Sequence, residues 1–194
     1  MSKADKTKEY IIESTAGIFN TKGYAGTSLN DMTEATGLTK GSIYGNFKNK
    51  DDVAVEAFKY NLAIMSHLFN SEMEKRSTFR DKLLAYPDMA ADFSGGTFQT
   101  GGCPVLNTAV ESDDTHPVLK QLAAQALMRW KNVIQNLLQS GIEAGEFHTA
   151  FQPEKTALTI LALLEGGIMI RKVTDSKDSI RLIMDSLREF ILRL

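Results

Sequence analysis

Two short helical patterns separated by a glycine, within residues 27–50, restrict this chain more than any other feature of its sequence. Thr27 can cap the first helix, because a threonine hydroxyl accepts a hydrogen bond from a free amide at a helix start. Gly37 then turns the chain, since glycine adopts positive φ without steric cost. Thr39 can cap the second helix in the same way. The expected unit is therefore a pair of short helices joined by a tight turn.

The second of these helices has one apolar side and one polar side. Ile43 and Phe47 lie four residues apart, so they face inward together. Residues 40–42 and Tyr44 remain available to a partner. Gly41 costs roughly 1 kcal/mol relative to alanine inside a helix, and close approach to a ligand surface would offset that cost. Such a pair of helices is the layout of a helix-turn-helix, whose second helix fits a DNA major groove about 12 Å wide.

Residues from about 8 to 55 resemble the DNA-binding domain of TetR/AcrR-family transcriptional regulators. The resemblance is specific, because many positions match at fixed spacing. The matching residues are Ile11, Ala16, Phe19, Lys22-Gly23-Tyr24, Thr27-Ser28-Leu29, the Ala35–Leu38 turn and Thr39–Lys50. One departure is Asn46, where the family usually has histidine, so the contact made from this position must differ.

The resemblance implies an all-α fold with an N-terminal three-helix helix-turn-helix domain, residues 1–50. A C-terminal helical domain for effector binding and dimerisation would follow over residues 51–194. The N-terminal residues of a recognition helix reach base edges, so this role is expected for Thr39, Lys40, Gly41 and Ser42. Phosphate contacts are expected for Tyr44, Asn46, Lys50 and Thr27. The residues expected to contact a double-stranded operator are Thr27, Ser28, Thr39, Lys40, Gly41, Ser42, Tyr44, Asn46 and Lys50.

Helical periodicity continues through most of the remaining chain. The expected helices cover residues 10–22, 51–75, 78–93, 104–112, 117–141, 153–172 and 176–194, with loops at 94–102 and 145–152. The long helix that begins at residue 51 joins the DNA-binding domain to everything after it. We expect an effector to act by moving this helix, which would change the separation of two DNA-binding domains.

Net charge is distributed unevenly along the chain. The whole chain carries −2, but residues 1–50 hold seven lysines against five acidic residues and so carry +2. The charge of the domain that binds matters more than the total. A charge of +2 is modest, so we expect few phosphate contacts and a need for two half-sites. Lys3, Lys6 and Lys8 are either a solvated arm or further phosphate contacts.

Composition is typical of a folded cytoplasmic protein. Hydrophobic residues make up 43% of the chain, which argues against disorder. No apolar run is long enough to span a bilayer, so no membrane partner is expected. Cys103 is the single cysteine, so an intrachain disulfide is impossible and a reducing compartment is favoured.

Two apolar stripes near the C-terminus favour a homodimer. The residues expected at the dimer interface are Leu161, Leu164, Ile168, Ile183, Leu187 and Phe190. An ordinary intrachain core is the alternative, and we expect it for about half of such residues. The resemblance favours a dimer, because regulators of this family pair through their last two helices into a four-helix bundle. A two-fold dimer would also present two recognition helices to half-sites about one helical turn apart.

Apolar and aromatic residues in the middle of the chain favour a pocket for an effector. The expected lining residues are Met65, Phe69, Phe93, Phe98, Cys103, Leu106, Met128 and Trp130. Core packing is the alternative role for any one of them, whereas the resemblance supports the pocket itself. These residues include no cationic cluster, so the expected effector is an uncharged or weakly polar small molecule.

Cys103 supports a second hypothesis about the regulatory signal. It opens an expected helix, where the helix dipole lowers the pKa of a thiol. The chain would then be a repressor that senses electrophiles or oxidants. The alternative is a buried, inert cysteine that acts as a small hydrophobic residue.

The sequence does not favour an enzyme, a metal site or a bound cofactor. His67, His116 and His148 are scattered without metal-ligand spacing, and no serine lies in a nucleophile elbow. A helical small-molecule-binding protein with a vestigial helix-turn-helix remains as the alternative from another class. Specific, salt-sensitive binding to a DNA duplex separates it from a regulator.

Overall fold

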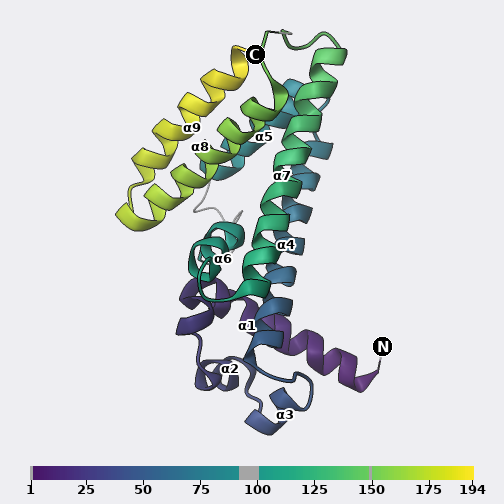
Figure 1. The fold of residues 1–194 in the computed structure, drawn as a ribbon, viewed down its shortest axis with the longest axis vertical. Helices are drawn as coiled ribbons and strands as arrows, with labels where there is room; N and C mark the ends of the chain where they lie inside the picture. The colour runs from purple at the N-terminus through teal and green to yellow at the C-terminus, as the bar shows by residue number, and fades with distance from the viewer. Residues whose placement is uncertain (1, 92–100, 149) are drawn as a thin grey trace. The chain divides into compact units, whose positions relative to one another are not determined.

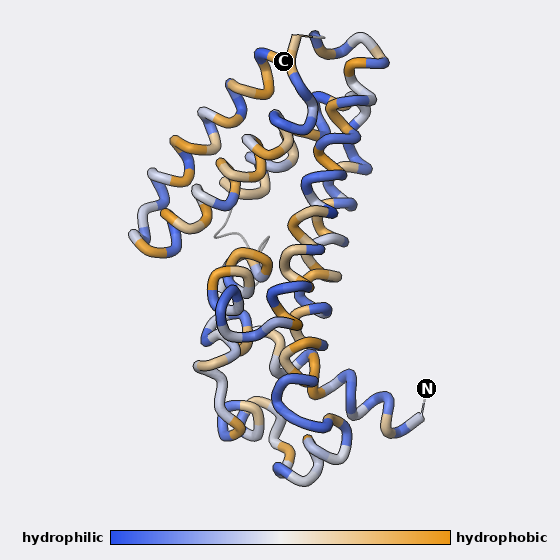
Figure 2. Tube along the Cα trace, viewed as in Figure 1, coloured by the Kyte–Doolittle hydropathy of each residue, from blue (hydrophilic) through white to orange (hydrophobic). Residues whose placement is uncertain are grey.

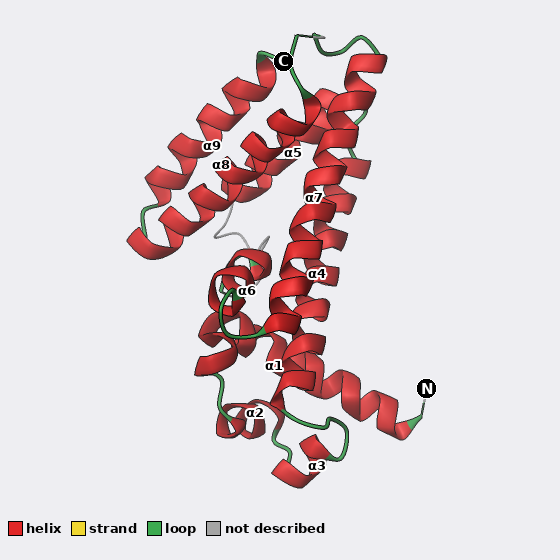
Figure 3. Ribbon diagram, viewed as in Figure 1, coloured by secondary structure: helices red, strands yellow, loops and turns green. Residues whose placement is uncertain are grey.

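The computed structural model describes residues 2–91, 101–148 and 150–194 (Figure 1). Every regular element in these ranges is a helix, so the expected all-α class is confirmed (Figure 3). The helices are α1 (Lys3–Gly26), α2 (Leu29–Thr36), α3 (Lys40–Tyr44), α4 (Lys50–Glu74), α5 (Phe79–Ala91), α6 (Pro104–Ser112), α7 (Pro117–Glu143), α8 (Pro153–Thr174) and α9 (Lys177–Leu192). Among the residues described, no helix combines the length and apolarity that crossing a bilayer requires.

The chain forms two compact units. The first contains residues 1–65 and 99–124, and the second contains residues 66–98 and 125–194. Both α4 and α7 therefore contribute residues to each unit. The boundary suggested by the sequence lies after residue 50, at the first residue of α4, whereas the two units divide within that helix, after residue 65.

Helix α1 is longer than the periodicity of the sequence indicates. It begins at Lys3, because Ser2 and Asp5 form a reciprocal capping box in which each side chain accepts from the other residue's amide. Near its end, Gly23 has φ 75° and interrupts the helical geometry. The three N-terminal lysines are thus part of an ordered helix, and Lys8 lies 5.3 Å from the Phe47 ring centroid.

The first unit has an apolar core shared by its helices. Ile11, Met32, Ile43 and Val53 come from α1, α2, α3 and α4, and each has 0% of its surface exposed. Asn61 of α4 donates to the carbonyl of Ala16 in α1 at 2.9 Å, which satisfies a buried polar pair. The core thereby fixes α2 and α3 against the first part of α4.

The second unit is held by close packing of α5, α8 and α9. Gly167 in α8 permits this approach, because a Cβ there would lie only 2.7 Å from the Met184 side chain of α9. Hydrophobic and hydrophilic residues alternate along α8 and α9 in Figure 2. Arg80 of α5 donates to the carbonyls of Leu192 at 2.9 Å and Glu146 at 2.7 Å. It therefore connects the start of α5 to the C-terminal end of α9.

Candidate functional site

The turn between α2 and α3 has the geometry that its glycine permits. Gly37 adopts φ 65° in the left-handed region, and its amide donates to the carbonyl of Thr33 at 2.9 Å. Thr39 follows in an extended conformation, and its hydroxyl oxygen accepts from the Ser42 amide at 3.2 Å. The predicted turn at Gly37 and the predicted cap at Thr39 are both confirmed.

Helix α3 buries one side and exposes its first turn. Ile43 is 0% exposed and Phe47 is 4% exposed, so both are buried as predicted. The helix ends at Tyr44, however, so Phe47 lies beyond it and not within the same helix as expected. Thr39, Lys40 and Gly41 are exposed, and Ser42 is half-buried. A Cβ built on Gly41 would come no closer than 3.9 Å to the chain's own atoms outside the local helix backbone. Intrachain packing therefore does not require a glycine at position 41.

The start of α2 differs from the expectation that Thr27 caps it. Ser28 is the cap: its hydroxyl oxygen accepts from the Asp31 amide at 3.1 Å, while the Asp31 carboxylate accepts from the Ser28 amide at 2.7 Å. Thr27 is 0% exposed, and its hydroxyl donates to the carbonyl of Gly23 at 2.6 Å. The cap assigned to Thr27 is therefore wrong by one residue, and its hydroxyl is occupied within the chain.

Asp31 links this cap to α1. Its carboxylate also accepts from the Lys22 ammonium at 2.5 Å. The ammonium, followed by the Ser28 hydroxyl and amide, holds the pKa of the Asp31 carboxyl well below its usual range. Asp31 thus remains an anion at the N-terminus of α2, where a negative charge is favourable.

Two of the predicted phosphate contacts make hydrogen bonds inside the chain. The Lys50 ammonium donates to the carbonyls of Tyr24 at 2.9 Å and Thr27 at 3.1 Å, and it lies 4.3 Å from the Tyr24 ring centroid. Asn46 donates its side-chain amide to the carbonyl of Ser42 at 2.9 Å. Lys50 therefore fastens the end of α1 to the start of α4.

A polar cluster beside Lys50 was not evident in the sequence. The Tyr24 hydroxyl donates to the Asp51 carboxylate, and this bond, with burial, raises the pKa of Tyr24 to about 12. The His116 ring lies edge-on to Tyr24 at 4.7 Å between centroids, and its Nε2 is 4.0 Å from the Asp51 Oδ2. These residues join α1, α4 and the segment before α7, so their spacing along the chain gave no signal.

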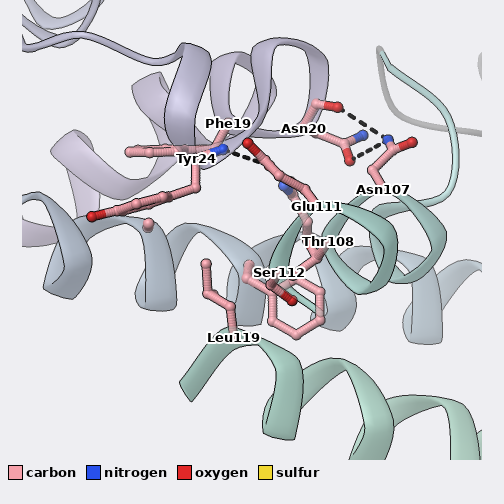
Figure 4. Close-up of a pocket in the computed structure, with 11 residues that line it drawn as sticks. Phe19, Asn20, Tyr24, Asn107, Thr108, Glu111, Ser112 and Leu119 are labelled. Atoms are coloured by element: carbon pink, nitrogen blue, oxygen red, sulfur yellow. Dashed lines mark hydrogen bonds between the residues drawn. The ribbon is translucent and has the colours of Figure 1, made fainter. Parts of the chain in front are cut away.

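A small pocket in the first unit lies next to this cluster (Figure 4). It is lined by Phe19, Asn20, Tyr24, Ala54, Phe58, Asn61, Asn107, Thr108, Glu111, Ser112 and Leu119. Figure 4 shows Glu111 of α6 directed at Tyr24, and Asn107 directed at Asn20. None of these residues belongs to the effector pocket expected from the sequence.

The residues expected to line that effector pocket occur in both compact units. Met65 and Cys103 are buried and Leu106 is half-buried in the first unit. In the second unit, Phe69 is buried, Trp130 is half-buried and Met128 is 48% exposed. Phe93 and Phe98 lie outside the described residues.

Three aromatic rings cluster in the second unit. The Phe69 centroid lies 5.4 Å from that of Trp130 and 5.2 Å from that of Tyr86. Tyr86 was not anticipated, because its periodic position in α5 resembles that of any core residue. It is 1% exposed, and burial raises the pKa of its hydroxyl. The cluster combines aromatic faces with the polar groups of tyrosine and tryptophan, a combination common in ligand sites.

Cys103 has the position, but not the exposure, of a reactive thiol. It is the N-cap of α6, and its Sγ accepts from the Leu106 amide at 3.5 Å. The residue is 0% exposed. In the described parts of the chain, no group of three or more His, Cys, Asp or Glu side chains is placed to hold a metal ion.

The six residues expected at a dimer interface have two different environments. Leu161, Leu164, Ile168 and Leu187 are buried within the single chain, where they pack α8 and α9 into the core of the second unit. Ile183 and Phe190 are half-buried. The exposed apolar residues of these two helices are instead Leu158, Met169, Ile170, Val173, Leu182 and Leu192.

Comparisons with known proteins agree with this geometry. Residues 11–57 match the family model described as bacterial regulatory proteins, tetR family. Residues 80–187 match the tetracyclin repressor-like C-terminal domain. A crystal structure of a TetR-family transcriptional regulator from Cytophaga hutchinsonii is 44% identical, with a TM-score of 0.95, covering 99% of this chain and 96% of that one.

Two curated relatives match along most of the chain. The uncharacterized HTH-type transcriptional regulator YxaF of Bacillus subtilis (strain 168) is 25% identical over 189 residues, 96% of each chain. The HTH-type transcriptional repressor DhaR of Mycobacterium sp. (strain GP1) is 22% identical over 171 residues, 88% of this chain and 85% of that protein. The chain belongs to the TetR family of transcriptional regulators, and its helix-turn-helix is the DNA-binding part.

Proposed function

We propose that the protein is a homodimeric repressor that a small-molecule effector releases from its operator. The observation that carries this proposal is the first turn of α3, in which Lys40 and Gly41 are exposed while Ile43 of the same helix is buried in the core of the first unit. A helix-turn-helix contacts base edges with this part of its second helix. The relative DhaR is described as a repressor, which supports repression over activation as the proposed effect on transcription.

Selection of bound duplexes from a random pool tests the DNA-binding part of this proposal. We expect one enriched, two-fold symmetric site whose half-sites lie about one helical turn apart. Its binding should weaken steeply as salt rises, because phosphate contacts release counterions. A pool that stays random after selection would favour a small-molecule-binding protein with a vestigial helix-turn-helix.

The exposed side of α8 supports the homodimer. Leu158, Ala162, Gly166, Met169 and Val173 recur every three or four residues and so share one side of the helix. In the part of the chain that the structure describes, no atom outside the local helix lies within 4 Å of where a Cβ on Gly166 would be, so a second helix could approach closely there. This stripe, which we call the α8 stripe, is the surface we propose for the partner copy, together with the exposed Leu182 of α9.

The aromatic cluster of the second unit supports an uncharged or weakly polar effector. Phe69, Tyr86 and Trp130 contribute aromatic rings and no cation, and the Tyr86 hydroxyl donates to the Met73 Sδ at 3.9 Å. Phe69 belongs to α4, whose first half is part of the DNA-binding unit. An effector that binds near Phe69 with different affinity in two positions of α4 would shift the balance between them.

A library screen tests this switch. Compounds that change Trp130 fluorescence or raise thermal stability should also lower operator occupancy, and the operator should weaken their binding by the same factor. Compounds that bind tightly but leave operator affinity unchanged would contradict the proposal that an effector releases the protein from DNA. The complete burial of Cys103 favours this small-molecule mechanism over sensing through the thiol.

A further inference from the structure

A carboxylate from α6 accepts hydrogen bonds from backbone amides at the end of α1. The Glu111 side chain accepts from the amide of Tyr24 at 2.7 Å (Figure 4) and from the amide of Ala25 at 2.8 Å. Gly23 makes this possible, because a Cβ there would lie 2.3 Å from the Glu111 Oε2. Its φ of 75° also belongs to the region that favours glycine. Charge-assisted bonds from one carboxylate to two amides are stronger than neutral ones.

A second set of hydrogen bonds lies one turn earlier on both helices. The Asn107 side-chain amide donates to the carbonyl and the side-chain oxygen of Asn20 at 3.0 Å each, and to the carbonyl of Gly101 at 2.8 Å. Asn20 in turn donates to the carbonyl of Gly102 at 3.0 Å. Asn20 is only 4% exposed, so this network lies in a site where an unmade hydrogen bond is costly.

Residues 24–28, which we call the α1–α2 corner, connect α1 to the two helices of the helix-turn-helix. The chain passes from Ala25 through the buried Thr27 to Ser28, the cap of α2. From the other side, Lys50 of α4 donates to the carbonyls of Tyr24 and Thr27. The corner is therefore fixed from α4 by a cation on its carbonyls and from α6 by an anion on its amides.

Helix α6 is not itself part of the helix-turn-helix. The chain reaches it from α5 and leaves it for α7, and both of these helices contribute to the second unit. We propose that Glu111 and Asn107, together the α6 clasp, are positioning residues for operator binding: they hold the α1–α2 corner so that α3 meets the major groove in register. No residue of the clasp touches DNA in this proposal, which rests only on the DNA-binding activity of the family.

The clasp acts by ordering the corner before DNA arrives. Without it, the corner has more conformations to lose on binding, and this entropy cost appears as weaker affinity. The number of phosphate contacts is unchanged, so the dependence of log K on log salt keeps its slope. A phosphate-binding residue would change both quantities, and a residue that only stabilises the fold would change neither in the folded protein.

Glu111→Gln in the full-length protein tests the clasp, with Asp114→Asn as the control that removes one exposed negative charge in the turn after α6. We expect Glu111→Gln to bind the selected operator about 5- to 30-fold more weakly with an unchanged salt slope, because one amide oxygen replaces a carboxylate that serves two donors. Asp114→Asn should bind like the wild type. Hydrogen exchange should quicken at the amides of Tyr24 and Ala25 in Glu111→Gln alone.

Asn107→Ala supplies a second variant of the same clasp, in case Glu111→Gln does not fold. It should also lose operator affinity at constant salt slope, while the exchange of the Asn20 side-chain amide quickens. Operator affinity at or above the wild-type level would overturn the proposal, either in folded Glu111→Gln with faster exchange at Tyr24 and Ala25 or in folded Asn107→Ala. Unchanged exchange at Tyr24 and Ala25 in folded Glu111→Gln would show that the carboxylate does not hold them, and would overturn it as well.

Discussion

Lys50 lies where the sequence favours a phosphate contact, yet its ammonium is directed at carbonyls of its own chain. Lys40, at the start of α3, is exposed. The two lysines therefore have different physical roles, although both lie in the same twelve-residue motif. A cation that donates to backbone carbonyls beside an aromatic ring stabilises the fold, whereas an exposed cation at a groove releases counterions from DNA.

Substitution of these two lysines should separate the roles. Lys50→Ala is expected to lower the free energy of unfolding by about 1–2 kcal/mol, because two charge-assisted hydrogen bonds are lost. Operator affinity should also fall, because Lys50 holds the same α1–α2 corner as Glu111, but the salt slope should stay at the wild-type value. Lys40→Ala should leave stability within about 0.5 kcal/mol and reduce the slope by about one. A salt slope that drops by one in Lys50→Ala would instead show that Lys50 contacts a phosphate.

Among the elements, the helix starts show how far local sequence can predict structure. The turn at Gly37, the cap at Thr39 and the inward pair Ile43 and Phe47 were all predicted, because each depends on neighbours within four residues. The cap of α2 was misplaced at Thr27, although Ser28 and Asp31 have the spacing of a capping box. Both Thr27 and Ser28 carry a hydroxyl that could cap the helix. Ser28 is the cap because Asp31, three residues later, completes a capping box with it.

The contribution of the α2 cap to the free energy of unfolding can be measured. Ser28→Ala should lower the free energy of unfolding by about 1 kcal/mol, because the Asp31 amide loses its acceptor at the helix start. Asn30→Ala is the matched control, since it alters an exposed residue in the first turn of the same helix. Chemical denaturation of both variants gives the comparison. Equal stability of Ser28→Ala and the wild type would mean that the cap contributes nothing.

Contacts that are distant in sequence account for most of what was not predicted. Glu111 meets amides 87 and 86 residues away, and Arg80 meets the carbonyl of Leu192. Nothing in the spacing of a single sequence marks such pairs, since each residue resembles an ordinary exposed charge on a helix. Tyr86 was missed for a related reason: an aromatic residue at a core position does not reveal which rings it will meet.

For the whole molecule, the last two helices illustrate the same limit. Their apolar stripes were recognised, but a stripe does not state whether it faces its own chain or a second copy. Leu164 and Leu187 are buried at 1% and 0% exposure within one chain, whereas Met169 is 49% exposed and Val173 is 79% exposed. Burial therefore moves the proposed interface from the first set to the α8 stripe.

Introducing a charge into the α8 stripe tests that interface. Met169→Glu should convert a dimer into monomers of 21.4 kDa in sedimentation experiments, because a partner helix would bury an unpaired carboxylate. Val118→Glu places the same charge at an exposed valine of α7, outside the stripe, and should leave the assembly unchanged. Dimers that persist in Met169→Glu at micromolar concentration would place the interface elsewhere.

Gly41 offers the most direct test of the central claim that the first turn of α3 meets DNA closely. A methyl group there has space within the chain, and alanine is the better helix former, so Gly41→Ala should stabilise the protein by about 0.5–1 kcal/mol. The account predicts that the groove leaves no space for the same methyl group. Titration of the selected operator, followed by fluorescence anisotropy, should therefore show at least about tenfold weaker binding by this more stable variant. Operator affinity equal to that of the wild type in Gly41→Ala would contradict the account.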